Sequence, residues 1–513
     1  MKMKKLNSSL LILLPLFLGA CSNSEKSPEV NTSKINKPNI IYILADDLGY
    51  NEVGAYGQTK IRTPNIDLMA QNGIKFTQHY SGSPVCAPAR STFVEGKHTG
   101  KSTVRGNYSK GSWTEELGQF PLPAGTRTIG NMFQEKGYTT ALIGKWGLGG
   151  PGSTGLPNKL GFDHFFGYLD QKRAHNYYPT HLWRNDMVVM LNNKRISGGV
   201  DGLGGAHLRL AKGLDENDPA SYKKFTQNDF APDLMAKEAL SFIRNNKDKP
   251  FFLYFPVTIP HVSLQVPEDS LKEYEGAFPE TPYTGRDQGW LSYTPHRTPR
   301  AAYAAMVTRM DRYVGQINAL LKELNLDENT LVIFTSDNGP TFNGGSDSKF
   351  FESAGPLRGL KGDVYDGGIR VPFIATWPGK IKPSQTSTLV SAQWDMMATF
   401  ADIIGGKPNE DHTGVSMTPT FFNQGKQQEH DYLYWELGNG QAVRLGDWKG
   451  VRMNVMRDAH SPVELYNLAT DIGEKHNVAE QHPEIVQQIH DIMMQREPAL
   501  YKRWNFDIAP LNK

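Results

Sequence analysis

Near-continuous apolar runs that end at polar residues constrain the fold of this chain more than any other feature. The run Asn39–Ala45 ends at the acid pair Asp46–Asp47, and the run Thr330–Thr335 leads to Asp337–Asn338. Short runs rich in β-branched and aromatic residues are typical of strands buried on both faces, as in α/β folds. Because open α/β sheets bind ligands where their strands end, these polar residues are the first candidates for a functional site.

The two acids Asp46 and Asp47 also suggest what such a site holds. Adjacent carboxylates at the end of a buried strand repel each other unless a positive charge lies between them. A divalent cation relieves that repulsion, whereas the alternative is a solvated turn that contains two acids. The Asp337 carboxylate and the Asn338 carbonyl are hard oxygen donors suited to Ca²⁺ or Mg²⁺ rather than to a thiolate-binding metal.

Further strands and helices are expected along the chain. The apolar pattern predicts strands over 74–80, 138–143 and 250–257. Helical spacing predicts a helix that Thr63 caps and Gly73 ends, and further helices over 128–136, 231–246 and 303–324. From about residue 424 the pattern changes to short antiparallel strands, over 432–437, 441–445, 448–453 and 464–467, followed by a helix over 483–494.

The N-terminus has the pattern of a targeting segment. Three lysines precede the apolar run Leu10–Leu18, which is too short to span a bilayer and indicates a secretory signal. The run leads to Cys21 in a sequence that resembles a bacterial lipobox, where the cysteine is lipidated; the alternative is an ordinary signal with a chance cysteine. We expect a lipoprotein signal peptide (1–20), a flexible tether (21–37), a catalytic domain (38–423) and a C-terminal subdomain (424–513).

Cysteine content and charge narrow the possible functions. The chain has only two cysteines, so Cys86 has no disulfide partner if Cys21 carries lipid, and a single leftover cysteine in an exported protein needs a chemical reason. The formal net charge of +2 falls to −1 once the three lysines of residues 1–20 are removed. Broad attraction to nucleic acid is therefore not indicated.

The segment around Cys86 carries the most specific motif. Cys86, Pro88 and Arg90, followed by Thr99 and Gly100, resemble the signature of the formylglycine-dependent sulfatases of the alkaline-phosphatase superfamily. In that family a maturation system oxidises the cysteine to an aldehyde, 3-oxoalanine (formylglycine). One hydroxyl of the hydrated aldehyde attacks sulfur and the other expels sulfate, which splits one hard step into two. A helix predicted after Arg90 places this group at a helix N-terminus, where backbone N–H groups favour anionic oxygens.

The resemblance implies a fold, a cofactor and a set of site residues. The fold is α/β, a large mixed, mostly parallel sheet between helices, with a small C-terminal antiparallel sheet and a helix. The cofactor is one divalent cation, Ca²⁺ in the first place and Mg²⁺ as the alternative. Its implied ligands are Asp46, Asp47, Cys86, Asp337 and Asn338. The side chains implied around the sulfate are Arg90, Lys145, His261 and Lys361, with His261 as the general acid.

The chain departs from the family at one position. Gly144-Lys145-Trp146-Gly147 resembles a family segment in which a histidine, rather than Gly147, contacts the formylglycine. Another histidine can fill that place, and His175 is the first candidate and His181 the second. An impaired site is the alternative.

Two other segments are expected to contribute to the implied site or to hold its loops in place. Tyr168–Trp183 is dense in aromatic, basic and imidazole groups that can line a saccharide cleft, although such aromatic residues can equally form core. The cleft candidates are Arg173, His175, Tyr177, Tyr178, His181 and Trp183. The segment Lys361–Pro372 resembles the family's Gly-rich loop, in which Asp366 and Arg370 are expected to tie the loop down.

Taken together, these features predict an exported, membrane-anchored bacterial lipoprotein that hydrolyses sulfate esters. The lipoprotein signal and the aromatic segment favour a sulfated polysaccharide as substrate, either algal, such as ulvan or carrageenan, or a glycosaminoglycan. One alternative is a phosphomonoester or phosphonate hydrolase of the same superfamily. Another is a non-catalytic binder of sulfated glycans, which the absence of a histidine at Gly147 motivates.

Overall fold

The computed structural model describes residues 37–108, 110, 118–196, 208–285 and 293–506. These described residues form one compact unit. The predicted signal peptide and all but the last residue of the predicted tether lie outside the described residues. In the described part of the chain, no helix combines the length and the apolar character that a membrane span requires.

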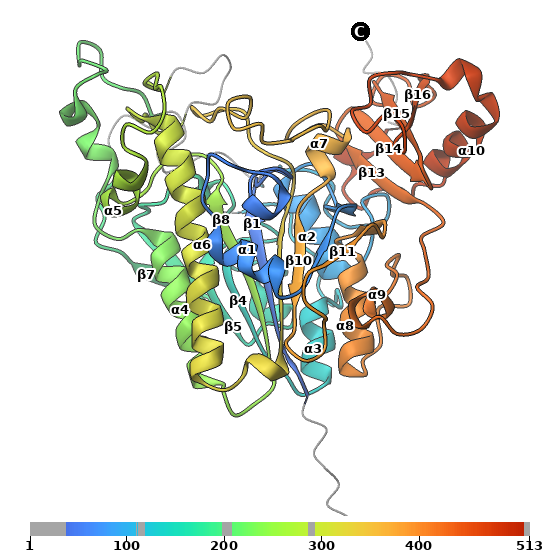
Figure 1. Ribbon diagram of the computed structural model, residues 1–513, viewed down its shortest axis with the longest axis horizontal. Coiled ribbons are helices and arrows are strands. Elements are labelled where there is room, and N and C mark those ends of the chain that lie inside the picture. The colour runs from blue at the N-terminus through green and yellow to red at the C-terminus, as the bar shows by residue number, and fades with distance from the viewer. Residues whose placement is uncertain (1–36, 109, 111–117, 197–207, 286–292, 507–513) are drawn as a thin grey trace, which may run out of the picture. The chain divides into compact units, whose positions relative to one another are not determined.

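A ten-stranded mixed sheet runs through this unit (Figure 1). In spatial order its strands are β11 (Gln385–Ser387), β2 (Ile74–Phe76), β10 (Phe373–Thr376), β9 (Thr330–Ser336), β1 (Asn39–Asp46), β8 (Phe251–Pro260), β4 (Thr139–Lys145), β5 (His164–Tyr168), β6 (His181–Arg184) and β7 (Met187–Met190). The neighbours β9, β1, β8, β4 and β5 run parallel, whereas β10, β6 and β7 are antiparallel to their partners. The mixed, mostly parallel sheet is therefore confirmed.

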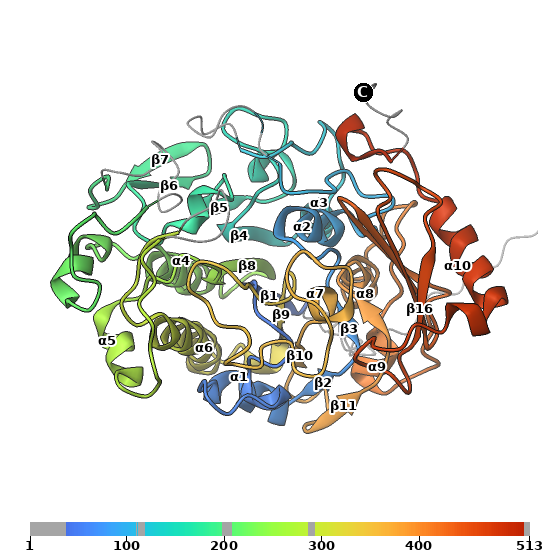
Figure 2. The same ribbon diagram turned by 90° about the horizontal axis from the view of Figure 1, so that it is seen from above.

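Helices cover both faces of the sheet (Figure 2). On one face lie α1 (Pro64–Gln71), α4 (Ala231–Asn245) and α6 (Pro299–Glu323). On the other face lie α2 (Cys86–Glu95), α3 (Ile129–Glu135) and α8 (Asp395–Ile404). Three short helices are α5 (Glu268–Leu271), α7 (Asp366–Ile369) and α9 (Thr418–Phe422).

The continuous apolar run of β1 follows from this layering. Ile41 and Ile43 pack in the core that contains α1, α4 and α6. Ile40 and Tyr42 pack in the core that contains α2, α3 and α8. Because successive side chains of a strand point to opposite faces, a strand covered on both sides needs apolar residues at every position.

A four-stranded antiparallel sheet forms the C-terminal part of the chain. Its strands are β13 (Leu433–Leu437), β14 (Gly440–Leu445), β15 (Trp448–Met453) and β16 (Val463–Asn467), and α10 (Pro483–Met494) packs against it. The expected small sheet and closing helix are therefore confirmed. The Trp435 indole N–H donates a hydrogen bond to the Ser81 carbonyl at 2.8 Å, which joins this sheet to the segment before Cys86.

Several expected elements differ in the structure. Helix α6 begins at Pro299 instead of 303, and β8 extends to Pro260 instead of 257. The helix expected after Arg90 already begins at Cys86, because Pro88 falls in the first turn, where its missing N–H has no intrahelical acceptor. The strand expected over 74–80 is split into β2 and β3 (His79–Tyr80). The split arises because β3 leaves the large sheet to pair with β12 (Ser391–Ala392).

Candidate active site

The ends of β1 and β9 bring the two polar pairs together. The strands run parallel with Ala45 beside Ser336, so both chains leave the sheet at the same edge. The Asp47 backbone N–H donates a hydrogen bond to Asp337 Oδ1 at 3.1 Å. Asp47 has a φ of 66°, in the left-handed region that Asp tolerates better than most residues, and this turns the chain at the end of the strand.

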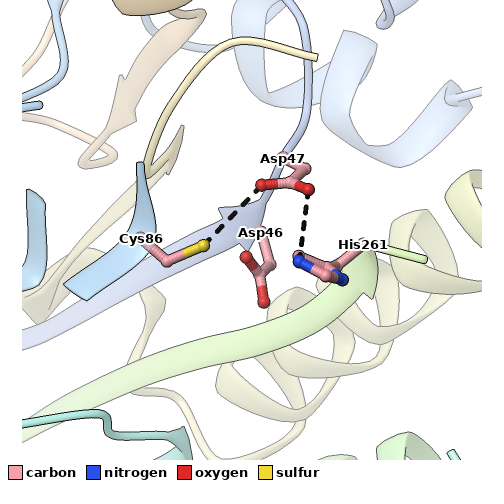
Figure 3. Close-up of side chains that lie close together, drawn as sticks. All are labelled: Asp46, Asp47, Cys86 and His261. Carbon is pink, nitrogen blue, oxygen red and sulfur yellow. Dashed lines mark hydrogen bonds and ion pairs between the residues drawn. The ribbon is translucent and has the colours of Figure 1, made fainter. Parts of the chain in front are cut away.

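Cys86 lies against these acids at the first residue of α2 (Figure 3). Its Sγ is 3.8 Å from Asp47 Oδ1, and the residue is 1% exposed. One possible ligand atom from each of Asp46, Asp47, Cys86 and His261 lies within 4.8 Å of the other three. Burial raises the pKa of the Cys86 thiol above its usual range.

Two buried oxygens in this cluster fit a cation. Asp46 Oδ1 and Asn338 Oδ1 have no hydrogen-bond partner among the residues that the structure describes. The Asn338 amide is oriented by its Nδ2, which donates to Asp47 Oδ1 at 2.8 Å. A buried acceptor without a partner costs free energy, and carboxylate and amide oxygens are the ligands that Ca²⁺ and Mg²⁺ prefer. These side chains therefore fit a hard divalent cation.

The carboxyl groups show the same need for positive charge. Burial, and after it the charge of Asp46, raises the pKa of Asp337 to about 7. Burial also raises the pKa of Asp47. For Asp46, burial opposes ionisation, but the surrounding cations, Lys145 first, outweigh it and hold the pKa below its usual range. A cation at this position favours the ionised form of all three groups.

Lys145 and Arg90 hold the acids from β4 and α2. Lys145 Nζ donates to Asp46 Oδ2 at 2.6 Å, and Arg90 Nη2 donates to Asp337 Oδ2 at 2.9 Å. Arg90 Nη1 also donates to the Lys145 carbonyl, which ties α2 to the end of β4. Both side chains are fully buried. The structure thus brings both predicted basic residues to the acid cluster.

Lys361 and His261 contact each other and Asp47. Lys361 Nζ donates to Asp47 Oδ2 at 2.7 Å and lies 2.9 Å from His261 Nε2. Because His261 Nδ1 donates to the Val262 carbonyl, its proton is on Nδ1 and its Nε2 accepts from Lys361. Burial, and after it Lys361, holds the pKa of His261 well below its usual range. His261 can therefore act as a general acid only after Nε2 gains a proton. Burial opposes the charge of Lys361, but Asp47 outweighs it and raises the pKa of Lys361, so Lys361 keeps its own proton.

His175, the first candidate to replace the family histidine, lies at this site. Its ring stacks on that of His261, with centroids 4.3 Å apart and an interplanar angle of 16°. The Ser263 backbone N–H donates to the His175 carbonyl at 3.3 Å, which holds the turn in place. His175 Nδ1 is buried and has no partner in the described ranges. The predicted proximity is present, and the catalytic role of His175 stays a prediction.

The rest of the aromatic segment does not form one saccharide surface. Tyr177 is fully buried, and its hydroxyl donates to the carbonyl oxygen of His261 at 2.5 Å. These contacts place Tyr177 in the core beside His261, where Tyr178 also packs, and its substrate contact stays a prediction. His181 lies on β6, where its ring is next to Trp183. Arg173 is half-buried in the turn that contains His175. Large aromatic side chains are often core residues, and composition alone does not separate the two uses.

Some supporting residues have no counterpart among the sequence predictions. Asn107 Oδ1 accepts a hydrogen bond from the Ala87 backbone N–H at 2.8 Å, at the start of α2. Ser81 Oγ donates to the Asp337 carbonyl and so fixes the loop after β9. Both residues come from irregular segments without hydrophobic periodicity, so only the tertiary contacts reveal them.

An α/β sheet that gathers acids, basic side chains and a residue at a helix N-terminus along one edge is suited to binding an anionic group and to stabilising charge that develops on it. The sulfatase family profile matches residues 38–406. A profile described as "N-sulphoglucosamine sulphohydrolase, C-terminal" matches residues 361–499. The chain therefore belongs to the sulfatase family.

Individual relatives agree with this assignment. The N-acetylgalactosamine-6-O-sulfatase of Bacteroides thetaiotaomicron is 29% identical, over 95% of this chain and 98% of the relative. Arylsulfatase A of Homo sapiens is 30% identical, over 89% of this chain and 87% of the relative. The crystal structure of Ps i-CgsB in complex with k-i-k-neocarrahexaose superposes with a TM-score of 0.69 at 28% identity, over 89% of this chain and 92% of that one.

Proposed function

We propose that this protein hydrolyses sulfate esters of sulfated saccharides and that residue 86 acts as formylglycine. The observation that carries the proposal is the place of Cys86. It opens α2 and lies 3.8 Å from Asp47, inside a buried cluster of acids and basic side chains. Membership of the sulfatase family supports the reaction class.

The chain's own side chains account for most of the proposed chemistry. Formylglycine supplies two hydroxyl groups on one carbon, and the divalent cation supplies a fixed positive charge. Lys145, Lys361 and Arg90 place further positive charge where sulfate oxygens gain negative charge during transfer. Because Asp46, Asp47 and Asp337 already orient these three groups, little reorganisation accompanies the reaction.

His261 is the proposed donor of the proton to the leaving alcohol, while Lys361 keeps its own proton and its charge. In the free site His261 Nε2 accepts from Lys361. An anionic ester that binds between them favours the protonated imidazole, because the opposite charge is then adjacent. His261 then donates this proton to the departing oxygen, while His175 stacks on the ring of His261.

The proposed substrate class rests on two relatives. One is named for N-acetylgalactosamine 6-O-sulfate, and another is a crystal structure in complex with k-i-k-neocarrahexaose. These support a sulfated sugar of a glycosaminoglycan or of an algal polysaccharide such as carrageenan or ulvan. The structural likeness to the phosphonate monoester hydrolase of Agrobacterium radiobacter, at 19% identity, concerns the fold alone.

We also propose a cellular location and a maturation step. The lipobox-like segment at Cys21 supports lipid anchoring of an exported bacterial protein, at the outer membrane, in the periplasm or on the cell surface. The motif Cys86-Ala87-Pro88-Ala89-Arg90 supports recognition by a formylglycine-generating system. Ca²⁺ is the proposed cation, and Mg²⁺ is the alternative for the same oxygen donors.

The first experiment measures residue 86 and the reaction together. Intact mass spectrometry of protein from its native host is expected to show formylglycine at position 86. The same protein is expected to hydrolyse 4-nitrophenyl sulfate much faster than 4-nitrophenyl phosphate, and a Cys86→Ala control is expected to be inactive. Unmodified cysteine with no turnover would favour the non-catalytic glycan binder, and faster phosphate turnover would favour the phosphoester hydrolase.

A second experiment tests the need for two hydroxyl groups on residue 86. A Cys86→Ser variant offers one hydroxyl, so it can accept a sulfuryl group but has no second hydroxyl to expel it. Incubation with 4-nitrophenyl sulfate is expected to leave one sulfuryl group bound per chain, seen by intact mass. A variant that turns over repeatedly would contradict the proposed role of the formylglycine.

A further inference from the structure

Two buried glutamine side chains that lie close to Gly147 have unused hydrogen-bonding atoms. Gln119 is 0% and Gln171 is 4% exposed. The Gln171 backbone N–H donates to Gln119 Oε1 at 3.1 Å, which fixes the orientation of the Gln119 amide. Within the described chain, Gln119 Nε2 and Gln171 Oε1 have no hydrogen-bond partner. Gln119 and Gln171, the amide pair, thus leave one donor and one acceptor unused.

Gly147 has no side chain that could cover the amide pair. A Cβ at this position would lie 3.2 Å from Gln171 Oε1 and 3.8 Å from Gln119 Oε1. Gly147 also has a φ of 88°, which L side chains rarely adopt. A larger residue at position 147 would therefore be strained and would cover the two amides.

The amide pair lies at the same edge of the sheet as the acid cluster. Gly147 follows Lys145, the last residue of β4, by two positions, and Lys145 contacts Asp46. Gln171 follows Tyr168, the last residue of the parallel neighbour β5, by three positions. The Gly147 backbone N–H donates to the Leu169 carbonyl at 3.2 Å, so the two loops are held against each other.

We propose that the amide pair binds an uncharged sugar substituent beside the scissile sulfate ester, a hydroxyl or acetamido group, and thereby selects the sulfated sugar. This inference rests on the proposed sulfatase function. A buried donor and a buried acceptor each cost free energy until they are bonded, and a group that both accepts and donates satisfies both. Because the pair has no net charge, a second sulfate or a carboxylate gains no ion pair here.

The expected selectivity follows from the chemistry of such sites. A site built to hydrogen-bond a substrate group strongly rejects the analogue that lacks the group, because its own polar atoms are then left unpaired. The aryl ring of 4-nitrophenyl sulfate has neither a hydroxyl nor an acetamido group beside its ester. The turnover of 4-nitrophenyl sulfate therefore measures catalysis at the sulfate ester without a contribution from the amide pair.

The test compares saccharide turnover with aryl sulfate turnover in two variants. Gln171→Met keeps the side-chain volume and removes the acceptor. Gln119→Met keeps the side-chain volume and removes the donor without adding a charge, together with the oxygen that accepts from the Gln171 backbone. For the best substrate among sulfated monosaccharides, including N-acetylgalactosamine 6-sulfate and galactose 6-sulfate, both variants are expected to lower kcat/KM about 10- to 100-fold. For 4-nitrophenyl sulfate, the expected change is about twofold or less.

A matched control separates selectivity from stability. Gln441, in β14, is 2% exposed and its Nε2 donates to the Tyr434 hydroxyl, so Gln441→Met removes a buried amide far along the chain from Gly147. This control is expected to lower the unfolding temperature and to leave the saccharide-to-aryl ratio unchanged. Binding of the best saccharide to a Cys86→Ala protein, measured by calorimetry, is expected to weaken when Gln171→Met is added.

Each other outcome overturns the inference. Equal losses on saccharide and aryl sulfate would mean that the amide pair only supports the fold. Unchanged turnover of both would mean that the pair binds structural water only. A wild-type enzyme that prefers 4-nitrophenyl sulfate to every saccharide would also overturn it, whereas an enzyme inactive on all of them refutes the proposed function itself.

Discussion

The ring of His261 is held by contacts on its edge and on its face. Nδ1 donates to the Val262 carbonyl, and Nε2 lies 2.9 Å from Lys361 Nζ. His175 stacks on the ring at a centroid distance of 4.3 Å. A ring fixed in this way presents Nε2 to a single position, which is what proton transfer to a departing oxygen requires.

Replacing His175 tests whether its nitrogens or only its ring face matter. If His175 takes over the role of the missing family histidine, His175→Ala and His175→Phe are both expected to lower kcat/KM for 4-nitrophenyl sulfate about 100-fold. Phenylalanine keeps an aromatic ring for stacking but has no nitrogen that can accept or donate a proton. A His175→Phe enzyme with nearly wild-type activity would contradict a catalytic role of the His175 nitrogens. The contribution of His175 would then be ring stacking only, which is worth about 1 kcal/mol.

Single side chains also show what the sequence could predict about the site. The meeting of Asp46 and Asp337 was predictable from the resemblance to the sulfatases, and it agrees with parallel strands that end at one edge of the sheet. The burial of Tyr177 was not predictable, because a buried aromatic residue and one that faces a ligand look alike in a sequence. The amides of Gln119 and Gln171 could not be predicted from the sequence. Their unpaired polar atoms are visible only in the tertiary structure.

At the level of elements, a buried ion cluster ties the loop after Lys361 to the C-terminal sheet. Lys449, in β15, donates to Asp366 Oδ1 at 2.6 Å and lies 2.8 Å from Glu474 Oε1. The Tyr80 hydroxyl donates to Asp366 Oδ2 at 2.9 Å. Asp366 begins α7, directly after the loop that carries the sulfate-binding candidate Lys361. The C-terminal sheet therefore helps to position a catalytic candidate.

Removing the charge of Lys449 is expected to be costly. Lys449→Met leaves Asp366 and Glu474 as two buried acids without their shared cation, which is expected to lower the free energy of unfolding by about 3–5 kcal/mol. Chemical denaturation measures this change. Lys60→Met removes an ion pair to Glu352, whose side chain is 71% exposed, and is expected to change stability by about 1 kcal/mol or less. Similar effects of the two substitutions would contradict the role of the buried cluster.

The contact between the turn after β1 and helix α6 predicts a pH dependence. Glu52 accepts hydrogen bonds from the Gly49 backbone N–H and the Tyr303 hydroxyl, each at 2.6 Å. Burial raises the pKa of Glu52 to about 7, above its usual 4.5. The folded state thus binds this proton more tightly than the unfolded state. The resulting stability is fully present below about pH 4.5 and is lost as the pH rises through about 7.

A Glu52→Gln variant cannot ionise and isolates this contribution. Between pH 5 and pH 8, its free energy of unfolding is expected to rise relative to that of the wild type by up to about 3 kcal/mol. Urea denaturation of both proteins at several pH values measures the difference. Parallel curves for the two proteins would show that Glu52 is already ionised in the folded state at low pH.

The elements themselves were more predictable than their ends. Continuous apolar runs identified β1, β8 and β9, because a doubly covered strand has no polar face. The four short strands after residue 424 and the helix Pro483–Met494 were also correct. The start of α2 at Cys86 was missed, because a helix boundary depends on the extended backbone of Val85 and on Pro88 together rather than on periodicity. The split of 74–80 depends on pairing with distant strands.

For the whole molecule, the acid cluster joins segments that are far apart in sequence. Asp46 and Asp47 end β1, Asp337 follows β9, and Cys86 begins α2. Each segment brings negative charge or a buried polar atom to one point, and burial alone works against the ionised acids. A cation at this point therefore stabilises the folded chain as well as the site, because it binds a geometry that the unfolded chain lacks.

Chelation tests this coupling in the complete protein. Without divalent cations, the unfolding temperature is expected to fall by a few degrees and activity on 4-nitrophenyl sulfate to be lost, and Ca²⁺ is expected to restore both. At a Ca²⁺ concentration 100 times the dissociation constant, the gain in stability is about 2.7 kcal/mol. Asp337→Asn keeps an acceptor for the Asp47 backbone but removes one charge, so its unfolding temperature is expected to respond less to Ca²⁺ in the same thermal scans. If chelator and Ca²⁺ leave the wild-type unfolding temperature unchanged, the buried acids are balanced by Lys145, Lys361 and Arg90 alone, and the cation has no part in holding the strand ends together.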